Sequence, residues 1–124
     1  MKLLACLPIE DTRLPLQFDN AGEVQLISLE EGVAKMKAAL AGRQDPSLVV
    51  AGRTSALRYG GVLEAVKRTK AYAQAGVDAV FLAGAKTQAE VEAVHAEVDI
   101  PLLLGGISVE LADKAFLAAV VRYM

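Results

Sequence analysis

The residues best suited to chemistry stand where short apolar runs of the sequence end. Glu10 and Asp11 follow the apolar run 3–9, and Arg53 follows a second run that ends at Gly52. Paired carboxylates suit Mg²⁺, and the planar guanidinium of an arginine binds a carboxylate or phosphonate through two parallel hydrogen bonds. If the fold brings these groups together, they predict a site for a divalent cation and a small anion.

Two more apolar runs end in polar or glycine-rich loops. These loops are Gly84-Ala85-Lys86 and Gly105-Gly106-Ile107. Arg58 and Tyr59, which follow Arg53 closely, could line the same site as Arg53. In parallel α/β folds, chemistry takes place at the carboxyl ends of the strands and in the loops that follow them. The alternative, from spacing alone, is that these charged residues are simply solvated.

The elements that must position these residues follow from the pattern of the chain. Strands are expected at 3–9, 47–52, 78–83 and 100–104, because each is a short apolar run bounded by turn residues. Helices are expected at 28–42, 62–75 and 87–98, with a last one beginning at Ser108. Ser28 with Glu31, and Thr87 with Glu90, have the spacing of a capping box. A polar loop at 12–27 is long enough to be functional or mobile.

The order of these elements predicts an α/β fold with four βα units in a single partial-barrel domain, residues 1–124. Four units are half of the eight that close a (β/α)₈ TIM-type barrel. A parallel sheet in sequential order has all its helices on one face and leaves the other face bare. Either the strand order reverses to give a doubly wound sheet, or the bare face is covered by self-association.

Composition excludes several classes of protein. The 124 residues are 54% hydrophobic and 23% charged, with a net charge of −2, which argues against disorder and against binding to nucleic acid. No apolar run approaches the roughly 20 residues needed to span a membrane. The single cysteine, Cys6, lies within an apolar run and is expected to fill the core. A lone cysteine suits a reducing compartment, so a cytoplasmic location is expected.

Five segments together resemble the isocitrate lyase/phosphoenolpyruvate mutase superfamily, most closely its oxaloacetate decarboxylase and phosphonomutase-like branch. They are LPIEDTRLP (7–15), SLEEGVAKM (28–36), LVVAGRT (48–54), AYAQAGVDAVFL (71–82) and IPLLL (100–104). The first resembles the family's fourth strand and the loop after it, and the resemblance covers residues 5 to about 105. After Leu104 the match decays, so the chain looks like the second half of a barrel, cut at both ends.

This resemblance implies a (β/α)₈ barrel that binds Mg²⁺ and a 2-oxo or 2-hydroxy dicarboxylate, and that makes or breaks C–C or P–C bonds through an enolate. By position, Glu10 matches an acid that helps to hold the metal, usually through water, and Asp11 matches its neighbour. Arg53, with Thr54 beside it, matches the segment of the family's barrel that binds the substrate's carboxylate or phosphonate. Arg53 and Glu10 are therefore the expected catalytic residues.

The sequence also departs from the family. The main metal-holding aspartates come from the first three strands of the family's barrel, which have no counterpart here. The loop 13–18 lacks the Cys and His of the lyase branch, which argues against cleavage of isocitrate. The resulting prediction is a partial barrel related to Mg²⁺-dependent lyases and decarboxylases of oxaloacetate-like 2-oxo acids, weakly active or inactive alone. One alternative is an active carbon–carbon lyase formed as a homo-oligomer or with a partner chain. The other is a non-catalytic, self-associating, anion-binding module.

Overall fold

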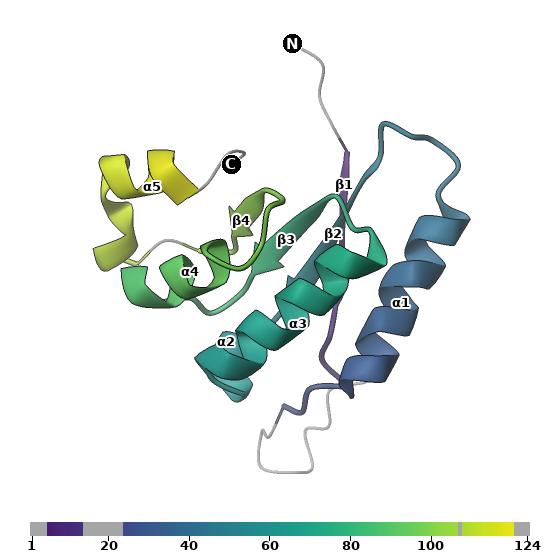
Figure 1. Ribbon diagram of the computed structural model, residues 1–124, viewed down its shortest axis with the longest axis horizontal. Coiled ribbons are helices and arrows are strands. Elements are labelled where there is room, and N and C mark those ends of the chain that lie inside the picture. The colour runs from purple at the N-terminus through teal and green to yellow at the C-terminus, as the bar shows by residue number, and fades with distance from the viewer. Residues whose placement is uncertain (1–4, 14–23, 107, 121–124) are drawn as a thin grey trace.

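The structure is a computed structural model that describes residues 5–13, 24–106 and 108–120. Its strands and helices alternate along the chain as the sequence predicts (Figure 1). The strands are β1 (Cys6–Glu10), β2 (Val49–Thr54), β3 (Ala79–Leu82) and β4 (Leu102–Leu104). The helices are α1 (Leu29–Gly42), α2 (Ala56–Tyr59), α3 (Val62–Ala75), α4 (Gln88–His95), the 3₁₀ turn η1 (Glu110–Ala112) and α5 (Lys114–Val120).

The four strands form one parallel sheet in the sequential order β1-β2-β3-β4. The doubly wound alternative is therefore wrong, because it requires the strand order to reverse. The helices α1, α3 and α4 form one layer against one face of the sheet (Figure 1). This is the arrangement expected for half of a (β/α)₈ barrel, since right-handed crossovers between neighbouring parallel strands place every helix on the same side.

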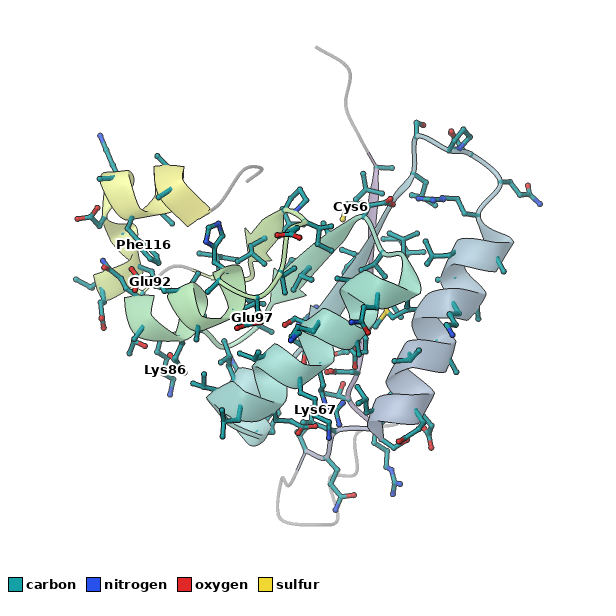
Figure 2. All side chains as sticks on the ribbon, in the orientation of Figure 1. Cys6, Lys67, Lys86, Glu92, Glu97 and Phe116 are labelled. Carbon is teal, nitrogen blue, oxygen red and sulfur yellow. The ribbon has the colours of Figure 1, made fainter. Side chains whose placement is uncertain are left out.

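Two apolar clusters fix the helices on the sheet. Met36 of α1, Val50 of β2 and Tyr72 of α3 are fully buried in the first, with Ile9 of β1 packed against them. The second joins α3, α4 and α5 to β3 and β4, and Figure 2 shows Phe116 of α5 on the α4 side of the molecule. Together the two clusters hold the helices against one face of the sheet.

On the opposite face of the sheet, the described part of the chain leaves β1 exposed, whereas the small side chain of Ala51 on β2 is buried. Ile9 and Val50 face the helices, so the pleat directs Pro8 and Ala51 to the other face. Cys6 and Pro8, both on that face, are exposed. The expectation that Cys6 fills the core is therefore wrong for this part of the chain, because β1 is an edge strand with nothing packed on its inner side.

Local capping explains where the helices begin. Thr87 and Glu90 form a complete capping box, as predicted. At Ser28 the described contacts give only half of the predicted box, in which the Ser28 hydroxyl accepts the Glu31 N–H. The last helix differs from the prediction, because Ser108 caps only the 3₁₀ turn η1. The helix α5 follows Asp113, whose carboxylate accepts the Phe116 N–H. The one-turn helix α2 lies between the predicted strand 47–52 and the predicted helix 62–75, where the sequence predicts no helix.

Most of the loop expected at 12–27 lies outside the described residues. Its two ends are paired, because the Arg13 N–H donates to the Gln25 carbonyl at 2.7 Å and the Ile27 N–H donates to the Asp11 carbonyl at 2.9 Å. Thr12 and Leu26 form an antiparallel bridge beside them. No helix in the described residues is long and apolar enough to cross a membrane.

Candidate functional site

A cleft of about 570 Å³ lies at the carboxyl ends of the strands. It is lined by residues from all four predicted strand-end loops: Glu10, Thr12, Val24, Arg53, Ser55, Arg58, Tyr59, Phe81, Ala83, Gly84, Ala85, Lys86, Gly105, Gly106 and Ser108. The structure thus gathers Glu10, Arg53, Arg58 and Lys86 at one edge of the sheet. The register of a parallel sheet accounts for this convergence.

Arg53 lines the cleft from the sheet edge that forms the cleft floor. The strand register places it between Glu10 on β1 and Phe81 on β3. Its guanidinium carbon stands 5.2 Å from the centre of the Phe81 ring, a cation–π contact that holds the half-buried side chain in place. The Arg53 Nε is buried without a hydrogen-bond partner in the described part of the chain. An arginine so held has N–H groups available to an anion.

Arg58 enters the cleft across the backbone of Gly84. Gly84 has a φ of +79°, and a Cβ atom there would lie 3.1 Å from both Cβ and Nε of Arg58. A glycine is therefore needed at this position for both conformation and space. Lys86 extends from the exposed loop just before α4 (Figure 2).

The cleft carries an excess of positive charge. Arg53, Arg58 and Lys86 line it, against Glu10 as its one carboxylate among the described lining residues. Such an excess in a concave site raises the local concentration of anions. The cleft is therefore suited to a small, negatively charged ligand.

Asp11, the predicted neighbour of Glu10 in metal binding, lies elsewhere. It is fully buried, and it is not among the residues that line the cleft. Its Oδ1 accepts the Ser55 N–H at 3.1 Å, and its Oδ2 accepts the Tyr72 hydroxyl at 3.0 Å and pairs with the Arg68 Nη1 at 3.4 Å. Both oxygens are thus occupied by protein donors, which favours a structural role. Metal binding by Asp11 stays a prediction that these contacts do not support.

Thr54, predicted to bind substrate, is also turned away from the cleft. It is fully buried, and its hydroxyl accepts the Ala56 N–H at 3.1 Å. That bond holds the first turn of α2, where a residue of the Ser/Thr type commonly binds a nearby backbone group. Substrate binding by Thr54 likewise stays a prediction, and the contacts assign its hydroxyl to the backbone.

The residues that the structure describes do not make a complete magnesium site. Within the described ranges, no group of three or more His, Cys, Asp or Glu side chains could hold a metal ion. Mg²⁺ needs near-octahedral oxygen ligands, and Glu10 is the one carboxylate that the described cleft offers. The further acids that the family resemblance requires are not supplied by these residues.

The sequence interpretation missed Arg68 and Tyr72. Both are buried on α3, four residues apart and therefore on the same face of the helix, where they bind Asp11. Burial and the negative charge of Asp11 raise the pKa of Tyr72, so its hydroxyl stays protonated and donates. The sequence did carry one signal for this cluster: Arg68 lies inside the apolar stripe of a helix, and a buried arginine needs a buried partner.

Comparisons with known proteins agree with this geometry. The phosphoenolpyruvate phosphomutase family matches residues 4–122, which extends the resemblance beyond residue 105. An oxaloacetate decarboxylase of Bradyrhizobium diazoefficiens is 52% identical over 114 residues, which are 92% of this chain and 39% of that protein. The chain thus spans about two fifths of the length of this curated relative.

Solved structures give the same assignment. A crystal structure of phosphonopyruvate hydrolase is 33% identical, with a TM-score of 0.75 over 93% of this chain and 40% of the other. A second structure of that name, in complex with oxalate and Mg²⁺, is 34% identical, with a TM-score of 0.65 over 80% of this chain and 35% of the other. The chain therefore belongs to the phosphoenolpyruvate phosphomutase family.

Proposed function

We propose that this chain forms the carboxylate-binding part of a site for an oxaloacetate-like 2-oxo acid, and that it is weakly active or inactive by itself. The observation that carries this proposal is the position of Arg53, fixed over Phe81 on the floor of a positively charged cleft with its Nε unpartnered in the described structure. The similarity to an oxaloacetate decarboxylase supports the choice of ligand.

Each residue of the cleft has a distinct part in the proposal. The Arg53 guanidinium binds the carboxylate next to the 2-oxo group through two parallel hydrogen bonds. Arg58 and Lys86 line the same cleft and attract the second carboxylate of a dicarboxylate. Their positive charges also favour the negative charge that develops on the 2-oxo oxygen when a carbon–carbon bond to that ligand breaks.

The described residues supply too few acids for full activity on their own. Glu10 is the cleft's one carboxylate among the described residues, and these residues hold no cluster of metal ligands. The remaining acids would come from outside the described residues, such as a second copy, a partner chain or a further part of a longer polypeptide. In the described structure, the exposed inner side of β1 and the edge strands β1 and β4 offer a surface on which such a complement would pack.

Calorimetric titration with oxalate tests the binding part. We expect Arg53→Ala to weaken binding by tenfold or more, since about 1.4 kcal/mol corresponds to a factor of ten and a charge-assisted pair exceeds this. Lys37→Ala on the exposed side of α1 is the control and keeps the affinity of the parent chain. Equal affinity for the parent and Arg53→Ala would contradict the proposal.

Pyruvate release from oxaloacetate in the presence of Mg²⁺ tests the activity. The purified chain is expected to match its Glu10→Ala variant, because the metal acids are incomplete. Turnover above that variant, lost again in Arg53→Ala, would instead support the active-lyase alternative. The molar mass in solution then distinguishes completion by a second copy from activity of a single chain.

A further inference from the structure

The buried cluster of Asp11, Arg68 and Tyr72 joins four segments of the chain. Asp11 follows β1, and its Oδ1 holds the Ser55 N–H in the turn after β2. Arg68 and Tyr72 reach Asp11 from α3, and the Arg68 Nη2 donates to the Ile27 carbonyl just before α1 at 2.6 Å. The Arg68 Nε also pairs with Glu64 at 2.9 Å.

Two of these segments carry the cleft's buried polar atoms that have no partner in the described structure. They are the Thr12 Oγ1, next to Asp11 along the chain, and the Arg53 Nε, two residues before Ser55. Both residues line the cleft, and Thr12 is 5% exposed. Buried polar atoms without a partner are costly, so their presence in a cleft points to a ligand that satisfies them.

Asp11 is suited to hold these segments because successive side chains of an extended chain point to opposite faces. Glu10 therefore faces the cleft while Asp11 points into the layer between sheet and helices. There its charge is neutralised by Arg68, which is 5% exposed. A buried pair with all its hydrogen bonds made is rigid, because any displacement leaves a charge unpaired.

We infer that Asp11 is a positioning residue: through the Ser55 N–H, Arg68 and Tyr72 it fixes the two segments that present Thr12 and Arg53 to the ligand. It acts without touching the ligand itself. That Asp11 fixes these segments follows from the fold alone. That this positioning strengthens anion binding rests on the proposed function.

The test compares Asp11→Asn with Val94→Ala. Asparagine keeps the size and one acceptor oxygen but removes the charge, whereas Val94 is fully buried in the α4 core and does not line the cleft. Oxalate affinity is measured at a temperature where circular dichroism shows both variants folded. We expect Asp11→Asn to bind about tenfold more weakly, as for loss of one charge-assisted interaction, and Val94→Ala to bind within twofold of the parent.

Amide hydrogen exchange at Ser55 supplies a second readout that needs no ligand. Exchange is expected to be faster in Asp11→Asn than in Val94→Ala at matched stability, because only the first replaces the charged acceptor of that N–H with a neutral and weaker one. Parent-like oxalate affinity together with parent-like exchange in Asp11→Asn would overturn the inference.

The two readouts separate the inference from the proposed function. If the parent chain itself fails to bind oxalate, the proposed function fails, and the Ser55 exchange alone decides whether Asp11 positions these segments. If Asp11→Asn does not fold, Tyr72→Phe replaces it, since it removes one donor to Asp11 and keeps the ring. Faster Ser55 exchange than in Val94→Ala then supports the inference, and an equal rate overturns it.

Discussion

The hydroxyl of Tyr72 stands against the backbone of Gly32, so closely that a Cβ atom on Gly32 would overlap it. Gly32 lies in the first turn of α1, and Tyr72 lies near the end of α3. The ring of Tyr72 also packs on Gly52 of β2, where a Cβ atom would come within 3.1 Å of the Tyr72 Cβ. The approach of α1, α3 and β2 to one another therefore depends on two positions without side chains.

Gly32→Ala is expected to destabilise the protein, although alanine favours a helix by about 1 kcal/mol over glycine. The new methyl group has no space beside Tyr72, and overpacking of a core costs roughly 1–3 kcal/mol. Gly42→Ala, at the end of the same helix with nothing within 4 Å, is the control and is expected to be neutral or stabilising. Urea unfolding measures both, and the same sign of change in the two variants would contradict this account.

Tyr72→Phe removes the hydroxyl that donates to Asp11 at 3.0 Å. Loss of a buried hydrogen bond to a charged acceptor is expected to lower the free energy of unfolding by about 1.5–3 kcal/mol at neutral pH. Since the pKa of Tyr72 is raised in the folded protein, this contribution is complete below the unfolded-state pKa of about 10 and is lost as the pH rises above it. The difference in unfolding free energy between parent and variant, measured by urea titration, should therefore be smaller at about pH 11 than at about pH 7.5.

The order of the elements could be predicted because each boundary has a local chemical signal. The Thr87–Glu90 capping box and the Gly76 that ends α3 with a φ of +109° both act within a few residues. The start of the last helix was misplaced because Ser108 and Asp113 each have the character of a cap. Only the packing of Leu111 and Phe116 into the core distinguishes the turn from the helix.

The candidate site was predicted only in part, because side chains alternate between the two faces of a strand. Glu10 and Arg53 enter the cleft, whereas their chain neighbours Asp11 and Thr54 point away from it. Period-two alternation already implies that two adjacent residues cannot both face the same side. The side-chain partners of Asp11 come from 57 and 61 residues away, and its backbone partner from 44 residues away, and no local pattern specifies such a pairing.

Glu90→Gln is expected to weaken the start of α4 in a pH-dependent way. Burial alone would raise the pKa of Glu90, but hydrogen bonds from the Lys86 and Thr87 N–H groups outweigh it and leave the pKa lowered. A lowered pKa gives stability that is present above the unfolded value of about 4.3 and is lost as the pH falls through the folded value. We expect a loss of about 0.5–1 kcal/mol at pH 7 that fades near pH 3.

Glu92→Gln is the matched control for this change. Glu92 is exposed on the same helix, so its substitution should leave the unfolding free energy close to that of the parent at both pH values. A gap for Glu90→Gln that stays constant from pH 7 to pH 3 would show that the carboxylate charge is not what stabilises the cap.

Gly84→Ala is expected to disturb the cleft, and Gly61→Ala is not. Both glycines have positive φ, so an alanine at either position costs about 1–3 kcal/mol in backbone strain. Only at Gly84 does the new methyl group also meet Arg58, whereas nothing lies within 4 Å at Gly61. Oxalate affinity should therefore fall in Gly84→Ala and stay unchanged in Gly61→Ala, as calorimetry can measure. A similar affinity loss in both would assign the effect to backbone strain.

Arg58→Ala distinguishes the two carboxylates of the proposed ligand. Arg53 is fixed over Phe81 on the cleft floor, whereas Arg58 is an exposed side chain that reaches the cleft across Gly84. If Arg53 binds the carboxylate beside the 2-oxo group, Arg58 contacts only the second carboxylate. Arg58→Ala should then weaken binding of the dicarboxylate oxaloacetate analogue 3,3-difluorooxaloacetate by roughly two- to fivefold, as for an exposed ion pair. Binding of the monocarboxylate pyruvate should not change, because it has no second carboxylate to lose. An equal loss for both ligands would instead place Arg58 beside Arg53 at a single carboxylate.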